Sequence, residues 1–190
     1  MQRSWRTDGD KLTFIACHPL SVAEKEGESD GQVIVRGGHE DIDGPERMVG
    51  DVNLFINESE DDEGSESACI GEVEIMVARL DMQGKGVGTV ILLAFLWYVF
   101  THLGAIVGEY SQSLGGDKTK VMKYLRVKID AGNERSIRLF EKVGFKKTSK
   151  KPNYFNELEL RYEIPARRAR GEMADLLGTD EPKIALYQLV

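Results

Sequence analysis

A chain of 190 residues, 41% of them hydrophobic, is long enough for one domain with a sizeable core. Its 32 acidic and 25 basic residues give a net charge of −7, which disfavours nucleic acid as a partner and suits a cationic acceptor. Cys17 and Cys69 form no spaced pair, and we identify neither a signal sequence nor an apolar span of about 20 residues. We therefore expect a cytoplasmic protein with reduced thiols and no membrane partner.

The first third of the chain predicts two short strands separated by loops. Residues 12–17 form an apolar strand, and residues 52–56 alternate as a second one. Residues 21–46 are rich in Gly, Ser, Glu and Asp, which predicts a long exposed loop. Residues 58–67 are strongly acidic, but their spacing is not that of a calcium loop, so we interpret them as a solvated hairpin loop.

The centre of the chain predicts a strand, a glycine turn and a buried helix. Residues 72–78 alternate so that Glu72, Glu74 and Met76 share one face of a strand. A turn rich in glycine follows, and residues 90–100 are then apolar without a polar face. A helix that is apolar all round has to be covered on most sides.

The glycine turn, Gln83-Gly84-Lys85-Gly86-Val87-Gly88, predicts an anion site. Glycines let a ligand approach the backbone, and the helix that follows directs free N–H groups and its positive dipole end at the turn. Three nucleotide motifs compete. No Gly-Lys-Ser/Thr follows, which excludes a phosphate loop, and the third glycine is one residue early for a dinucleotide fingerprint. The third motif, Q/R-x-x-G-x-G/A, matches at its fixed positions.

The second half of the chain predicts further alternation. Residues 104–120 contain Gly, Ser, Asp and Lys and are expected to be a surface excursion. Residues 121–130 alternate as a strand, and residues 158–164 as the closing strand. Between them, Asn133 and Gly144 suit the two ends of a helix.

Three segments together resemble one family. The glycine turn resembles the one that holds the pyrophosphate of acetyl-coenzyme A (acetyl-CoA) in the GNAT acetyltransferases, and residues 131–145, AGNERSIRLFEKVGF, resemble a helix of the same family. Residues 48–57, MVGDVNLFIN, together with the earlier KLTFIACHP, are similar to the N-acetyltransferase 9 subgroup, which is close to the ribosomal-protein N-terminal acetyltransferases.

The resemblance implies an α/β GNAT fold, a mixed and mostly antiparallel sheet flanked by helices. It assigns residues 1–164 to the acetyltransferase domain and residues 165–190 to a C-terminal tail. Members of the subgroup carry about one strand and two helices before the point that corresponds to Met1, so we expect the domain to be incomplete at its N-terminus.

The resemblance also implies the chemistry, transfer of an acetyl group from acetyl-CoA to an amine, with a protein N-terminus or a lysine as acceptor. The implied coenzyme-binding residues are Met76, Val77, Gln83, Gly84, Lys85, Gly86, Val87, Gly88, Thr89, Asn133 and Ser136. Met76 and Val77 would contribute backbone N–H groups, provided that their strand splays from the next. Asn133 is open to a second interpretation, a helix cap without a ligand.

The catalytic candidates are Glu72, Glu74 and Asn133. Either glutamate would take the proton of the amine, and either is open to the interpretation of a solvent-facing side chain. Many family members place a tyrosine acid where this chain has Phe140, so release of the thiolate would need water or another group. His18, His39 and His102 share no ligand spacing, and we expect no metal.

Two alternatives to an active acetyltransferase remain at this point. A coenzyme-A-binding pseudoenzyme or scaffold fits the short N-terminus and Phe140. A nucleotide-dependent reductase fits the glycine turn less well.

Overall fold

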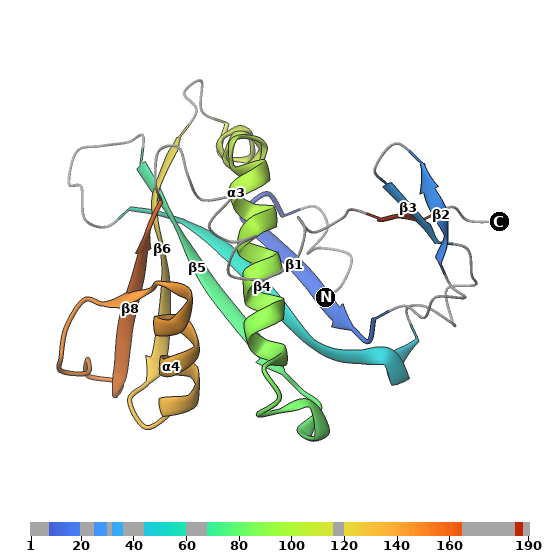
Figure 1. Ribbon diagram of the computed structural model, residues 1–190. Coiled ribbons are helices and arrows are strands. Elements are labelled where there is room, and N and C mark those ends of the chain that lie inside the picture. The colour runs from blue at the N-terminus through green and yellow to red at the C-terminus, as the bar shows by residue number, and fades with distance from the viewer. Residues whose placement is uncertain are drawn as a thin grey trace.

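The computed structural model has six strands in one mixed sheet, in the order β1–β4–β5–β6–β8–β7 (Figure 1). It describes residues 8–19, 25–29, 32–35, 44–59, 68–115, 120–164 and 185–187. The elements are β1 (Lys11–Cys17), β2 (Lys25–Ser29), β3 (Gln32–Val35), η2 (Pro45–Arg47), β4 (Met48–Glu58), β5 (Ala68–Val77), η3 (Leu80–Met82), α3 (Val87–Ser113), β6 (Val121–Asp130), α4 (Glu134–Val143), β7 (Lys146–Lys147), β8 (Glu157–Glu163) and β9 (Ala185–Tyr187). Only β5 and β6 pair in parallel in this sheet, which confirms the predicted mixed, mostly antiparallel arrangement.

The expected loop at residues 21–46 is wrong in part. It contains β2 and β3, which pair antiparallel, and β9 joins β3 in parallel to complete a small three-stranded sheet. Gly, Ser and Glu are poor strand formers on average, but strand preference depends on the pairing context, which composition does not reveal. The boundary predicted at residue 164 stays a prediction, although β9 lies beyond it. Most of the acidic stretch 58–67 lies outside the described residues.

The two faces of the six-stranded sheet differ. One face carries the apolar residues of each strand, such as Leu54, Val73, Leu125 and Leu160, and packs against α3 and α4 in a single core. Figure 1 shows both helices on this face of the sheet. The opposite face carries the polar residues of the alternation, and no helix of the described residues covers it. The sheet is therefore apolar toward its helices and charged on its other side.

Helix α3 is longer than the sequence predicted. It runs for 27 residues and includes Gly104 and Gly108, so the expected surface excursion at 104–120 is wrong over its first ten positions (104–113). Each glycine costs a helix about 1 kcal/mol relative to alanine. Val107 and Tyr110, which follow Gly104, are buried in the core, and their burial offsets that cost.

The composition of α3 also corrects the statement that the chain has no long apolar span. Its mean hydropathy reaches 2.2 over an 18-residue window, so the helix is long and apolar enough to cross a membrane by length and composition. In the fold, Leu92, Leu96 and Val99 are fully buried and pack in the core shared with the sheet, while Val90 is 58% exposed. The expected absence of a membrane partner stays a prediction.

The remaining elements confirm the sequence patterns. Strand β6 has the predicted bounds, and β1, β4 and β8 overlap their predicted positions. Helix α4 begins after Asn133, whose Oδ1 accepts a hydrogen bond from the Ser136 amide at 3.2 Å, and ends at Gly144 in a left-handed conformation with φ 111°. Both caps are those that the sequence predicts.

Candidate active site

Strands β5 and β6 separate halfway along their length. Their pairing begins at Ala68 opposite Val121 and ends at Glu72 opposite Arg126. Beyond that point β5 stays paired with β4 as far as Val77, and β6 stays paired with β8. One edge of β5 therefore loses its partner over residues 73–77. The splay on which the predicted role of Met76 and Val77 depended is present.

The open edge of β5 presents the backbone groups of alternate residues. The Ala78 amide donates to Val49 on β4 at 2.9 Å, so by strand alternation the N–H and C=O of Val77 point to the open side. Those of Met76 point to β4, so the expected contribution of the Met76 N–H is wrong. The Gln83 side chain confirms this direction, because its Nε2 donates to the Val77 carbonyl at 2.9 Å. A ligand in the gap would meet backbone donors and acceptors there, with Gln83 at its edge.

The glycine turn lies directly beside this open edge. Gly84 and Gly86 have φ of 73° and 82°, a conformation that side chains with a Cβ rarely adopt. Gly86 is the N-cap of α3 and provides no side-chain cap. As a result, the amides of Val87 and Gly88 have no hydrogen-bond acceptor among the described residues. Free amides at the positive end of a 27-residue helix form an anion site.

A cleft of about 650 Å³ runs from the open edge of β5 past the glycine turn to α4. Of the predicted coenzyme residues, those that line it are Met76, Val77, Gln83, Gly84, Gly86, Gly88, Thr89, Asn133 and Ser136. Lys85 and Val87 belong to the turn but are not lining residues. The cleft thus brings together two segments that lie about 50 residues apart in the sequence.

Sequence reasoning missed the basic wall of the cleft. Arg135, Arg138 and Lys142 project from α4 into its lining. Their spacing of three and four residues places them on one helix face, and this signal was readable in the sequence. Arg138 is paired with Glu134 at 3.0 Å. In a chain of net charge −7, three cations beside an anion site favour a phosphorylated ligand.

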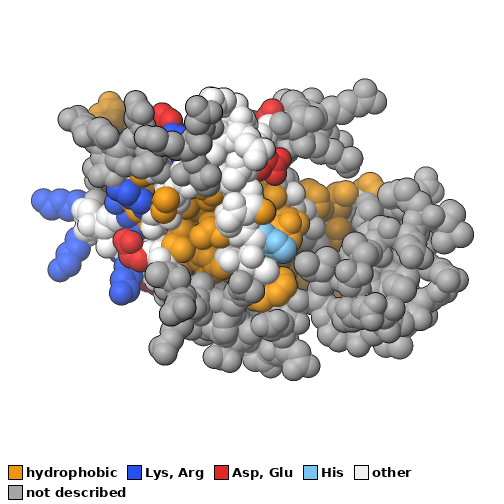
Figure 2. Space-filling view, turned by 90° about the horizontal axis from the view of Figure 1, so that it is seen from above, with side chains coloured by type: hydrophobic (Ala, Val, Ile, Leu, Met, Phe, Trp, Pro, Cys, Tyr) orange, Lys and Arg blue, Asp and Glu red, His pale blue; other side chains and the backbone are white. Residues whose placement is uncertain are grey.

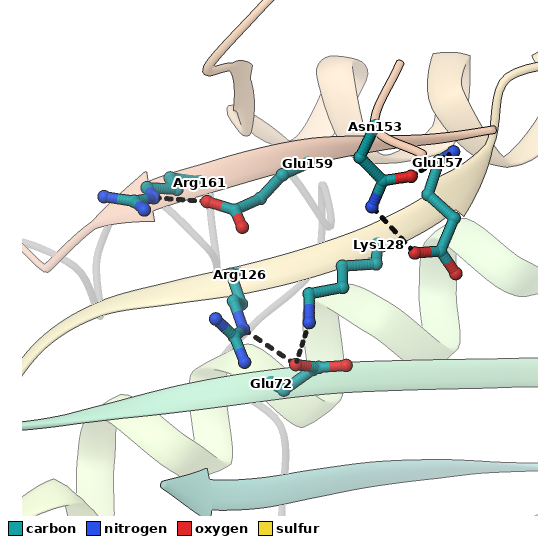
Figure 3. Close-up of polar contacts among 7 residues, drawn as sticks. All are labelled: Glu72, Arg126, Lys128, Asn153, Glu157, Glu159 and Arg161. Atoms are coloured by element: carbon teal, nitrogen blue, oxygen red, sulfur yellow. Dashed lines mark hydrogen bonds and ion pairs between the residues drawn. The ribbon is translucent and has the colours of Figure 1, made fainter. Parts of the chain in front are cut away.

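The two glutamates proposed as the base lie on the other, polar face of the sheet, and their surroundings differ. Glu72 is bonded to Arg126, with 2.7 Å between its Oε2 and Nε, and has Lys128 at 3.7 Å (Figure 3). Arg126 is only 7% exposed. A buried guanidinium needs its anion, so this pair gives Glu72 a structural role.

Glu74 is exposed and forms no ion pair or hydrogen bond within the described part of the chain. Partial burial of its carboxyl raises the pKa of Glu74 above the ordinary 4.5, and the negative charges of Glu72 and Asp51 raise it further. Asn53, directly opposite Glu74 on β4, donates to Asp51 at 2.7 Å. Of the two glutamates, Glu74 has the properties of a proton acceptor.

Phe140, which stands at the position of the family's tyrosine acid, is 1% exposed and packs edge-on against Phe145 at 5.0 Å. No tyrosine in the described ranges lines the cleft. The same ranges hold no group of three His, Cys, Asp or Glu side chains that would bind a metal ion.

A glycine turn at a helix N-terminus, a splayed strand pair and a basic cleft together form a site suited to a phosphorylated ligand that carries amide groups. The chain belongs to the GNAT acetyltransferases, since the family model of the Acetyltransferase (GNAT) domain matches residues 3–146. This membership makes it an N-acetyltransferase.

Its curated relatives carry the name of the subgroup that the sequence resembles. The N-acetyltransferase 9-like protein of Schizosaccharomyces pombe is 35% identical over 84% of this chain and 73% of its own length. The human alpha/beta-tubulin-N-acetyltransferase 9 is 33% identical over 86% of this chain and 61% of its own length.

Solved structures resemble the chain at lower identity. A chimera of the spermidine N-acetyltransferase SpeG from Vibrio cholerae with hSSAT gives a TM-score of 0.49 at 14% identity, covering 85% of this chain and 71% of its own. The structure of Arabidopsis thaliana NAA60 in complex with acetyl-CoA gives a TM-score of 0.45 at 15% identity, covering 82% of this chain and 77% of its own.

Proposed function

We propose that this chain transfers the acetyl group of acetyl-CoA to an amine of a protein, and that α/β-tubulin is the acceptor to test first. The observation that carries the proposal is the open edge of β5, residues 73–77, which lies beside the glycine turn and includes Glu74. Tubulin enters through the name of the human relative, which is 33% identical to this chain.

The cleft has the features that coenzyme A requires. Backbone amides of Val87 and Gly88 and the side chains of Arg135 and Lys142 supply positive potential for phosphates. The open edge at Val77 supplies backbone N–H and C=O groups for the amide-containing arm of the coenzyme. When bound, acetyl-CoA supplies an activated acetyl group as a thioester. The open edge also offers donors to the negative charge that grows on an acyl oxygen during transfer.

The amine has to be neutral before it can attack. An α-amino group has a pKa of about 8 and a lysine about 10.4, so at neutral pH a base has to remove a proton. We assign that role to Glu74, whose carboxylate is not held in an ion pair. Burial raises the pKa of Glu74, and the negative charge of Glu72 raises it further, toward the range in which Glu74 accepts protons.

Departure of the coenzyme does not require a side-chain acid. A thiol of pKa about 8.5 leaves readily as an anion. The burial of Phe140 is therefore compatible with turnover. We infer that the acceptor amine approaches from the side of the sheet opposite the helices. Glu74 and Asp51 lie on that polar face, and their negative charges attract a cationic amine.

The test is mass spectrometry of tubulin dimers incubated with the chain and acetyl-CoA. The expected result is an acetyl group on an N-terminal or lysine amine, with the rate lost in Gly88→Val and kept in Leu114→Ala, whose residue lies at the far end of α3. Acetylation of an unrelated peptide but not of tubulin would refute tubulin as acceptor. Coenzyme binding without acetylation of any amine in a peptide library would refute the transfer itself.

A further inference from the structure

The two sides of the gap between β5 and β6 carry opposite charges on the polar face of the sheet. Glu72 and Glu74 project from β5, and Asp51 lies on the same face of β4. Arg126 and Lys128 project from β6 toward Glu72. Figure 2 shows Lys and Arg side chains gathered on the side of the molecule where Figure 1 places β6 and β8. The cations of β6 therefore stand near two carboxylates, of which Glu74 has to stay unpaired to act as a base.

The pairing of β5 with β6 ends at the residues of an ion pair. Glu72 stands opposite Arg126 in the last register of the parallel ladder. Its Oε2 atom lies 2.7 Å from Nε of Arg126 and 3.7 Å from Nζ of Lys128, so one carboxylate holds both cations (Figure 3). The side chains of Glu72 and Arg126 are 21% and 9% exposed, and solvent ions screen such a pair only weakly. This cluster marks the point at which the strands part.

Lys128 is placed where it can turn to either glutamate. If the register continued for two residues, Lys128 would stand opposite Glu74. Glu72 and Glu74 share one face of β5 and lie roughly 6.6 Å apart along it, because a strand rises about 3.3 Å per residue. Lysine carries a compact charge on a flexible stem, and the side chain of Lys128 is 36% exposed. An ion pair between Lys128 and Glu74 would bridge the gap and make Glu74 a weaker proton acceptor.

We propose that Glu72 is a positioning residue for the acetyl transfer, which holds the two cations of β6 where the strands part and so keeps the gap open and Glu74 free of a positive charge. The inference rests on the proposed function for the role of Glu74 as base. The charged groups that face Glu74 are Glu72 on its own strand, Asp51 on β4 and Lys128 on β6. Of these three, only Lys128 would lower the pKa of Glu74 by moving closer to it.

The test is a titration of the Glu74 carboxyl by ¹³C NMR in the whole chain, in a double-mutant cycle of Glu72→Gln and Lys128→Gln. Glu72→Gln should lower the pKa of Glu74, because a repelling charge is lost and Lys128 is released toward it. In that background Lys128→Gln should raise the pKa of Glu74 by about one unit, and in wild type by much less. Shifts of equal size in the two backgrounds would overturn the proposal, because Lys128 would then not respond to Glu72.

A second background guards against loss of the fold, since Glu72→Gln leaves the buried Arg126 without its anion. Glu72→Gln/Arg126→Gln replaces the ion pair by two neutral amides, and Lys128→Gln should have the same enlarged effect there. Glu159→Gln is the matched control, because Glu159 stands opposite Lys128 on β8 but is bonded to Arg161, with 2.6 Å between Oε1 and Nε. It should leave the response to Lys128→Gln as in wild type, and an enlarged response would contradict a specific role of Glu72.

Kinetics separates positioning from a merely structural role. Glu72→Gln should raise KM for acetyl-CoA roughly threefold and move the acid limb of the pH–rate profile to lower pH, and Lys128→Gln should reverse both changes in that background. Tm should stay low in the double variant, because Arg126 still lacks its anion. Recovery of neither KM nor the pH profile would refute positioning. The expected pKa cycle without acetylation of any amine would instead refute the proposed function and leave the hold of Glu72 on Lys128 intact.

Discussion

Replacement of Gly88 by valine should preserve the fold and weaken coenzyme binding. A Cβ at this position would lie 3.4 Å from Cδ2 of Leu139 and 3.7 Å from Cγ2 of Val77, which are ordinary contacts. Valine has a slightly higher helix propensity than glycine, by about 0.3 kcal/mol, so Tm should change by roughly 1 °C at this chain length. The branched side chain stands between two walls of the cleft, where the coenzyme has to pass. We expect the Kd for coenzyme A to rise at least tenfold, or about 1.4 kcal/mol.

The assay is calorimetric titration of coenzyme A together with thermal melting of the free protein. Gly108→Val is the matched control, because it lies on the same helix and its new Cβ meets nothing within 4 Å. It should leave Kd unchanged. Gly86→Ala is less informative, since φ of 82° adds backbone strain to any steric effect. An unchanged Kd in a folded Gly88→Val protein would refute the assignment of the cleft.

Three further changes separate structure from chemistry. Glu72→Gln should lower the free energy of unfolding by about 1–3 kcal/mol, because it leaves the buried Arg126 without its anion, as urea titration would show. Glu74→Gln should lower kcat by about 10²- to 10⁴-fold without loss of stability at neutral pH, because burial raises the pKa of Glu74 and makes its charged form the less favourable one in the folded state. The acid limb of the wild-type pH–rate profile should lie above pH 4.5, and it should vanish in the variant. Asn133→Ala should cost about 1 kcal/mol as a lost helix cap, and a matching loss of coenzyme affinity in titrations would show a ligand contact as well. Arg135→Gln should weaken coenzyme A binding more at low salt than at high salt, and an equal loss at both would contradict a charge interaction.

The fold was predictable where a local pattern determines the structure. The alternation of β5, the apolar run of α3 and the caps of α4 depend on neighbours within a few residues, and all were predicted correctly in kind. The end of α3 was missed because Gly104 indicates a break, whereas the burial of Val107 and Tyr110 in the tertiary core keeps the helix intact. The strands at 25–35 were also missed because a distant contact determines them. They pair with each other and with residues 185–187, and no local pattern indicates that pairing.

The candidate site was predictable in part. The glycine turn and Asn133 carry their own sequence signal, and both border the cleft. The different surroundings of Glu72 and Glu74 carry no sequence signal, because they depend on the register that sets Glu72 opposite Arg126, 54 positions further along the chain. The basic wall of α4 does carry a signal, in the spacing of its cations by three and four residues.

The central claim is that acetyl-CoA lies in this cleft with its reactive end at the open edge of β5. Backbone amide exchange of ¹⁵N-labelled protein, followed by NMR with and without acetyl-CoA, tests it residue by residue. The amides of Val77, Val87 and Gly88 should become protected when the coenzyme is added, and that of the buried Leu160 on β8 should not change. Unchanged exchange at Val77 and Gly88, or new protection confined to another part of the fold, would contradict the account.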